Sequence, residues 1–112
     1  MARSELFIHP NEHDWVELGG GVRRRMLGHH EDLMMVEVAF EKGAVGAVHS
    51  HPHIQVSYVA SGRFEFDIGG SKTVLETGDS FMVPADVEHS CKALEAGVLV
   101  DSFAPHRSDF LD

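Results

Sequence analysis

Apolar and polar residues alternate in short runs along most of this chain. In Phe64–Ile68 the even positions are Phe, Phe and Ile and the odd positions are Glu and Asp, as in a strand that buries one face. Similar runs end at turn signals that contain glycine or aspartate. The pattern predicts strands over residues 15–18, 22–27, 33–40, 54–60, 64–68, 72–76, 80–83, 87–94 and 98–103.

Short strands at regular spacing are typical of an all-β sandwich or barrel. Apart from a turn near residues 11–14, no segment shows a sustained helical period. The chain has 112 residues, near the commonest size of one domain, and 43 % of them are hydrophobic, enough for a core. We therefore expect an all-β fold, a small β-barrel, formed by a single domain over residues 1–112.

The charge and the cysteine content exclude several kinds of partner and location. The formal net charge is −9, whereas a nucleic-acid-binding protein needs a basic face, so we expect no nucleic-acid partner. No apolar run approaches the roughly 20 residues of a membrane helix, and the N-terminus lacks a signal core. The single cysteine fits a reducing compartment. We expect a cytoplasmic protein without membrane contact.

Histidines at short spacing form the most informative motif. His49 and His51 lie two residues apart, and in a strand such residues point to the same face. Gln55 keeps that parity in an extended segment, and a later strand would have to bring His89 alongside. Neutral imidazoles bind zinc, copper, iron and nickel. The motif predicts one divalent transition metal, with Gln55 in a place where a carboxylate is the usual ligand.

One acidic residue lies in the last predicted strand. Leu99, Asp101 and Phe103 share one face of residues 98–103, and the alternation leaves two interpretations open. Asp101 faces the interior, where a carboxylate is costly unless it is paired or lies near a metal. Alternatively, Asp101 faces solvent and the valines at positions 98 and 100 face the core.

The spacing of these residues resembles the two motifs of the cupin family. The first motif matches Gly43, His49, His51, Gln55 and Gly62, with glutamine in place of the usual glutamate. The second matches Gly78, Pro84 and His89, with Asp86 where glycine is common. The resemblance implies a cupin double-stranded β-helix barrel in which His49, His51, Gln55 and His89 bind the metal, and it implies a homodimer.

Several segments resemble the pectin-degradation cupins of the KdgF type more closely. They are residues 19–25, 33–38, 43–53, 63–66 and 101–111. Such proteins are similar in having glutamine as the fourth ligand. The resemblance implies conversion of 4,5-unsaturated monouronates, which lyases release from pectin or alginate, into linear 5-keto-4-deoxyuronate. By position, Asp101, Phe103 and Arg107 match the functional C-terminal residues of that family.

The ligand set and the C-terminal residues together suggest a mechanism for a small anionic sugar. A neutral Gln55 leaves more positive charge on the metal than glutamate would, which favours Lewis-acid chemistry over redox chemistry. We expect Asp101 to move protons, Arg107 to form a fork on the substrate carboxylate, and Phe103 to pack on the sugar ring. The metal could be nickel, zinc, iron or manganese.

Two other functions stay open at this point. The cupin fold hosts many chemistries, so a metal-dependent dioxygenase or lyase acting on another small molecule is one alternative. A non-catalytic small-ligand-binding cupin is the other. Among the remaining polar residues, His53 is expected at the rim of the pocket or in solvent rather than as a fifth ligand. Alternation places Arg24 opposite Arg23 and Arg25, so at most part of this run lies near the pocket.

Overall fold

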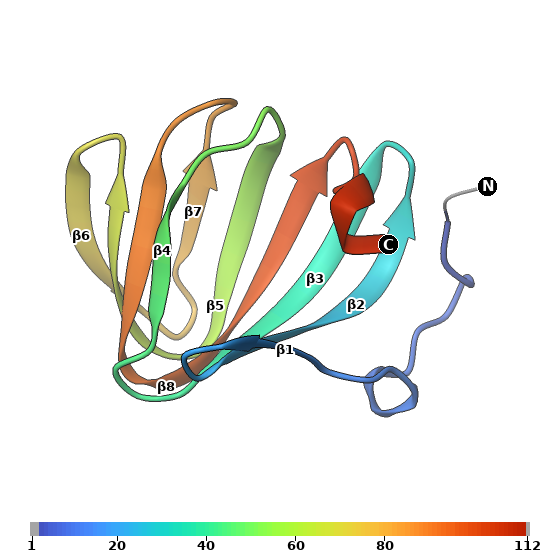
Figure 1. The fold of residues 1–112 in the computed structure, drawn as a ribbon, viewed down its shortest axis with the longest axis horizontal. Coiled ribbons are helices and arrows are strands. Elements are labelled where there is room, and N and C mark those ends of the chain that lie inside the picture. The colour runs from blue at the N-terminus through green and yellow to red at the C-terminus, as the bar shows by residue number, and fades with distance from the viewer. Residues whose placement is uncertain (1–2, 112) are drawn as a thin grey trace.

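The computed structural model describes residues 3–111, and these form an eight-stranded antiparallel sheet with two short 3₁₀ helices (Figure 1). Within this range no helix is long and apolar enough to cross a membrane. The expected all-β fold is confirmed. The elements in chain order are η1 (Pro10–Glu12), β1 (Val16–Gly19), β2 (Val22–His30), β3 (Leu33–Phe40), β4 (Val45–His49), β5 (Ile54–Ile68), β6 (Ser71–Glu76), β7 (Ser80–Val83), β8 (His89–Ala104) and η2 (Ser108–Leu111).

Two long strands, β5 and β8, replace four of the predicted short ones. The sequence predicted breaks at residues 61–63 and 95–97, because glycine lies at positions 62 and 97. The structure shows continuous strands there, with irregular register between Val59 and Phe64. The glycines therefore mark a bend within the strands rather than turns between them. The sequence did not predict β4, in which glycine and alanine interrupt the alternation.

The bend lets β5 and β8 close the barrel. The first part of β5 pairs with β7 and with the end of β8, whereas its second part pairs with β6 and with the start of β8. On its other edge β8 pairs with β4 near its start and with β3 near its end. Figure 1 shows the strands curving around a common interior, with η2 beside the ends of β8 and β3.

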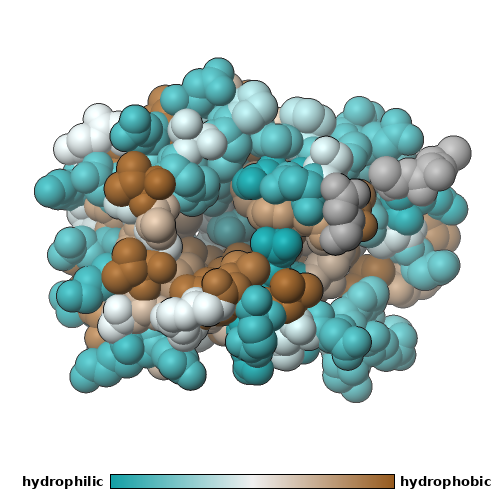
Figure 2. All heavy atoms as spheres, viewed as in Figure 1, coloured by the Kyte–Doolittle hydropathy of each residue, from teal (hydrophilic) through white to brown (hydrophobic). Residues whose placement is uncertain are grey.

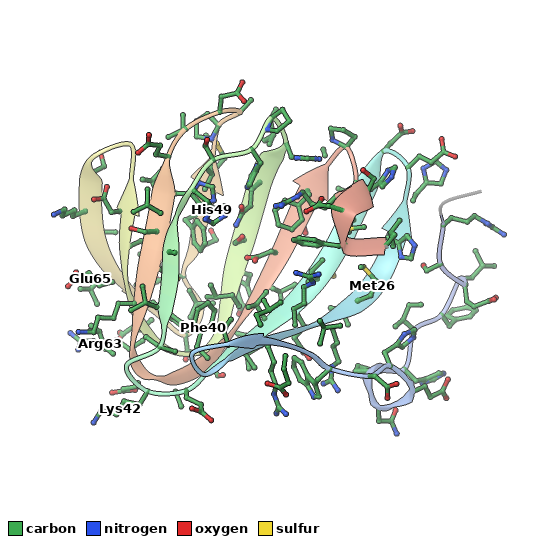
Figure 3. All side chains as sticks on the ribbon, viewed as in Figure 1. Met26, Phe40, Lys42, His49, Arg63 and Glu65 are labelled. Carbon is green, nitrogen blue, oxygen red and sulfur yellow. The ribbon has the colours of Figure 1, made fainter. Side chains whose placement is uncertain are left out.

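The interior is divided between apolar filling and a polar end. Phe40 and Phe64 meet edge to face with ring centroids 5.2 Å apart, and Phe66 packs on Phe81 at 4.3 Å. A second cluster joins the buried Met34 to the half-buried Phe110 of η2. Figure 3 shows Phe40 in the lower part of the barrel and His49 in the upper part, while Arg63 and Glu65 point outward. The polar groups therefore lie above an apolar floor.

The bend tolerates no side chain at Gly97. A Cβ atom there would lie 2.3 Å from the carbonyl oxygen of Ser61 and 2.9 Å from the ring of Phe64. Gly62, opposite, has a φ of 90°, and a Cβ atom there would lie 2.7 Å from backbone atoms of Ala96 and Gly97. The two strands thus approach through glycine at the point where they change partners.

We expect Gly97→Ala to lower the free energy of unfolding by about 1–3 kcal/mol or more, because the methyl group forces β5 and β8 apart. Chemical denaturation followed by fluorescence measures this change. Gly28→Ala is the matched control, since its Cβ would meet nothing closer than 3.9 Å and should change stability by less than about 0.5 kcal/mol. Equal losses in the two variants would contradict this account of the bend.

Candidate active site

Three histidines converge in the upper part of the barrel. His49 ends β4 and lies directly opposite His89, which begins β8. Their ring centroids are 4.2 Å apart, and one ring nitrogen from each of His49, His51 and His89 lies within 4.8 Å of the others. His51 lies outside β4, in the segment that leads to β5. His49 and His51 were expected on one face of the same strand, and this is wrong because β4 ends at His49. The chain changes direction after His49 and still brings the three rings together.

A backbone hydrogen bond fixes this turn. The N–H of Asp86 donates to the carbonyl oxygen of His51 at 2.8 Å. Asp86 has a φ of 63°, in the left-handed region that favours glycine and that aspartate also tolerates. Asp86 therefore adopts the backbone conformation that suits the glycine common at this position of the cupin motif. The contact ties the segment that precedes β5 to the segment that precedes β8.

In each of the three histidines the Nδ1 atom forms a hydrogen bond with a backbone carbonyl oxygen. The Nδ1 atoms of His49, His51 and His89 lie 2.8, 3.0 and 2.9 Å from the carbonyl oxygens of residues 47, 53 and 87, respectively. A carbonyl oxygen only accepts, so each Nδ1 carries the proton and each Nε2 presents a lone pair. Burial lowers the pKa of His51 and His89, which favours the neutral rings that bind metals.

Two observations show that these atoms fit a cation. The Nε2 atom of His89 is buried and has no hydrogen-bond partner among the described residues. The Nε2 atom of His51 lies 3.1 Å from Oε1 of Gln55. With Nδ1 protonated, these two atoms are both acceptors and have no hydrogen between them. A metal ion bound here would accept electron pairs from all of these atoms. It would give Nε2 of His89 a partner and relieve the repulsion between the two acceptors of His51 and Gln55.

Gln55 is buried and belongs to a series of hydrogen-bonded side chains that crosses from β5 to β8. Its Nε2 donates to Oγ of Ser57 at 3.0 Å, and that hydroxyl donates to Oδ1 of Asp101 at 2.6 Å. Asp101 is 9 % exposed, so of the two orientations left open by the sequence the interior one is correct. Burial raises the pKa of Asp101 to about 6, against the opposing effects of the Ser57 hydrogen bond and of His49.

Gln55 and Asp101 line a cavity of about 180 Å³, together with His49 and His89. The rest of its lining is mostly apolar, and Figure 2 shows a recess in the middle of one face of the molecule. Pockets for drug-sized ligands are roughly 300–1,000 Å³, so this one suits a single small molecule. Cys91 also lines it, and burial raises the pKa of that thiol to about 11.

The C-terminal residues form one wall of the cavity. Phe103 is 4 % exposed and meets the ring of His51 edge to face at 5.5 Å. The guanidinium of Arg107 lies 5.2 Å from the ring centroid of Phe103 and 4.3 Å from that of Phe110. Its Nε and Nη2 donate to the carboxylate of Asp109 at 3.1 and 3.0 Å. Three of its five N–H donors make no hydrogen bond to the residues that the structure describes.

Of the three arginines at positions 23–25, Arg24 lines the cavity. Its guanidinium lies 3.9 Å from the ring centroid of Phe110, on which Arg107 also stacks, and it lines the cavity. Arg23 and Arg25 instead stack on Trp15. Alternation had placed Arg24 opposite its two neighbours, but nothing in the sequence shows which face turns inward.

His53 is half-buried and lies beside His51, with ring centroids 5.5 Å apart. Its Nε2 is 3.1 Å from the carbonyl oxygen of His106, and this contact ties the segment before β5 to the C-terminal tail. The Nδ1 atom of His53 is buried and has no partner among the described residues. The group of ring nitrogens that lie within 4.8 Å of one another contains His49, His51 and His89, without His53. His53 therefore lies beside the group of three histidines rather than in it.

Comparison with known proteins agrees with this architecture. Residues 36–107 match the cupin domain family. Over 103 residues, or 90 % of this chain and 94 % of the relative, the sequence is 48 % identical to the pectin degradation protein KdgF of Dickeya dadantii. The structure matches an RmlC-like cupin from Shewanella frigidimarina with a TM-score of 0.95 and 44 % identity, covering 98 % of this chain and 99 % of that one.

A further solved structure is KdgF from a Halomonas species. It matches with a TM-score of 0.90 and 39 % identity and covers 96 % of this chain and 99 % of that one. Oxalate decarboxylase from Bacillus subtilis, at 21 % identity and a TM-score of 0.77, shares the fold alone. The resemblance seen in the sequence is confirmed, and the chain belongs to the cupin family and, within it, to the KdgF family of pectin degradation proteins.

Proposed function

We propose that this protein converts 4,5-unsaturated monouronates, derived from pectin or alginate, into linear 5-keto-4-deoxyuronate. The observation that carries the proposal is a buried carboxylate, Asp101, in the same small cavity as His49 and His89, two of the three histidines that could hold a metal. The relative that is 48 % identical is a pectin degradation protein. The proposed compartment is the cytoplasm, because the single cysteine leaves the chain without an internal disulfide.

We propose that His49, His51 and His89, through Nε2, and Gln55, through Oε1, hold one divalent metal such as nickel, zinc, iron or manganese. The support is the hydrogen-bonded Nδ1 atoms, the unpartnered Nε2 of His89 and the mismatched acceptors of His51 and Gln55. When bound, the metal supplies Lewis acidity that favours negative charge on the substrate oxygens. The neutral Gln55 adds no charge that would weaken this effect.

The reaction is a balanced isomerisation. The ring bond between C1 and the ring oxygen breaks, the C1 hydroxyl loses a proton and becomes an aldehyde, and C4 gains a proton as C5 becomes a ketone. We assign both proton transfers to Asp101, because its carboxylate lines the cavity beside the histidines. The apolar floor around Leu99 and Phe66 keeps the reacting atoms away from bulk water.

Substrate binding is assigned to the C-terminal wall. Arg107 has three free N–H donors and lines the cavity, so it can pair with the substrate carboxylate while Asp109 holds its other edge. Phe103 offers a buried ring on which the sugar can pack. A structural metal site would need neither a buried acid nor an arginine beside it, and this favours catalysis over simple ligand storage.

We expect metal-replete protein to accelerate the loss of ultraviolet absorbance from the conjugated double bond of lyase-generated unsaturated monouronate. Chelation should abolish the acceleration. Asp101→Asn should lower kcat by about 10²–10⁴-fold, since it removes the proton carrier. Arg107→Ala should mainly raise KM.

Two controls separate this function from its alternatives. Zinc-loaded protein should be active without oxygen uptake, whereas a dioxygenase would require a redox-active metal and oxygen. Unchanged turnover in both Asp101→Asn and Arg107→Ala would refute the assignment of these residues. No acceleration by metal-replete wild-type protein would refute the proposed reaction.

The metal assignment predicts stabilisation by metal. Zinc or nickel at 100 times its Kd should add about 2.7 kcal/mol to the free energy of unfolding, and EDTA should remove that gain. His89→Ala should show little gain at the same metal concentration, because it removes a ligand from the buried side of the site. His30→Ala, at the exposed end of β2, is the control and should respond like wild type. A wild-type response in His89→Ala would contradict the assignment.

We also propose that the protein is a homodimer of the single cupin domain formed by residues 1–112. The outer face of the sheet carries an apolar row in which Met35, Ser102, Val56 and Met82 lie side by side across β3, β8, β5 and β7. Met35, Val56 and Met82 are 43, 52 and 53 % exposed. A second copy that covers this row would bury it.

The charge on this face supports association of two copies. The chain has a net charge of −9, so two copies repel each other. An interface without unpaired acidic groups keeps this repulsion small. On the stretch of β3 that bears the row, the half-buried acid Glu37 is paired with Arg25 at 2.7 Å. Neighbouring positions of the row add further exposed apolar side chains, namely Ile54 and Tyr58.

Light scattering should give a mass of twice the 12.3 kDa chain at micromolar concentration. Val56→Asp should give a monomer, because it places like charges opposite each other in the centre of the contact. Val74→Asp, on the exposed side of β6, is the matched control and should remain dimeric. A dimer that survives Val56→Asp would place the interface elsewhere, and a wild-type monomer would refute the dimer.

A further inference from the structure

The hydroxyl of Ser57 connects two groups of the site, although among the described residues it forms no hydrogen bond with the three histidines. Ser57 is 2 % exposed and lies two residues after Gln55, on the same face of β5. Across the sheet it pairs directly with Asp101 of β8. Its Oγ is 3.0 Å from Nε2 of Gln55 and 2.6 Å from Oδ1 of Asp101.

The donors and acceptors of Gln55, Ser57 and Asp101 allow only one arrangement of their hydrogen bonds. The ionised carboxylate of Asp101 only accepts, so the single hydroxyl hydrogen of Ser57 is donated to it. The hydroxyl oxygen then has only lone pairs left for Gln55, which must present its NH₂ group to Ser57. The carbonyl oxygen of Gln55 therefore points the other way, toward His51.

The opposite orientation of the amide would harm the site. If the amide of Gln55 turned over, its NH₂ group would face the bare Nε2 of His51, 3.1 Å from the present oxygen. An N–H donor there would form a hydrogen bond with the lone pair that a metal needs. An isolated glutamine would prefer that orientation, because it replaces two facing acceptors by a donor and an acceptor.

We infer that Ser57 is a positioning residue that holds the amide of Gln55 with its oxygen, rather than its nitrogen, directed at the metal site. The inference rests on the proposed role of Gln55 as a ligand. Asp101 is the anchor, because its carboxylate fixes the direction of the Ser57 hydroxyl. One carboxylate thereby both lines the reaction cavity and, through Ser57, sets the orientation of a metal ligand on the neighbouring strand.

The direct test is cobalt(II) binding to purified protein, followed by visible absorption and by competition with a chelator. Ser57→Ala should weaken cobalt binding about 10–100-fold, the usual effect of losing a group that orients a ligand. Its absorption spectrum should shift toward that of Gln55→Ala, because a turned amide no longer donates its oxygen. Ser57→Thr, which keeps the hydroxyl, should retain the wild-type spectrum.

A change of ligand separates orientation from general structural damage. A carboxylate has two equivalent oxygens, so in a Gln55→Glu background the orientation set by Ser57 no longer matters. Adding Ser57→Ala to Gln55→Glu should therefore change cobalt affinity less than about twofold, whereas a packing defect would cost the same in both backgrounds. Ser102→Ala, on the opposite face of β8, is the matched control and should bind cobalt like wild type. Thermal unfolding of the metal-free variants confirms that each one folds.

The outcomes distinguish this inference from the function on which it rests. If Gln55→Ala leaves the cobalt spectrum unchanged, Gln55 is not a ligand, and both the inference and the proposed ligand set are wrong. If Gln55→Ala changes the spectrum while Ser57→Ala binds cobalt with wild-type affinity and spectrum, the inference alone is overturned. An equal loss of affinity from Ser57→Ala in the wild-type and Gln55→Glu backgrounds also overturns it.

Discussion

The antiparallel pairing of β5 with β8 is the constraint on which the rest of the structure depends. It places Gln55 opposite Phe103 and Ser57 opposite Asp101, and it runs on through the bend to His89. An amide, a hydroxyl and a buried acid thereby meet in one register without any loop between them. Because side chains alternate along a strand, a slip of one residue would turn every one of these groups to the opposite face.

The interior is polarised along this pair of strands. Aromatic rings such as those of Phe40 and Phe64 fill the lower part of the barrel, and in its upper part imidazoles, an amide and a carboxylate face a small cavity. Burial of the polar groups is costly unless each atom has a partner. Backbone carbonyls satisfy the Nδ1 atoms, and Ser57 connects Gln55 to Asp101. The atoms left over are acceptors that face one another, and this is the arrangement that a cation stabilises.

Much of this could be predicted from the sequence, and the exceptions have physical causes. The strand β3 was predicted with its observed bounds, and the histidine motif predicted which rings would meet. The long strands were divided at Gly62 and Gly97, because a glycine in a bend and a glycine in a turn look alike in one sequence. Alternation could not orient Asp101, since both faces of its strand are apolar elsewhere. Ser57 carried no signal, because its role arises only when β8 lies beside it.

The proposed metal site consists of three Nε2 atoms and the oxygen of Gln55. Anomalous diffraction from crystals of metal-loaded protein locates the metal. We expect a single peak at about 2.0–2.2 Å from Nε2 of His49, His51 and His89 and from Oε1 of Gln55. A peak at another group of side chains, or a metal at the histidines with the amide of Gln55 turned away, would contradict it.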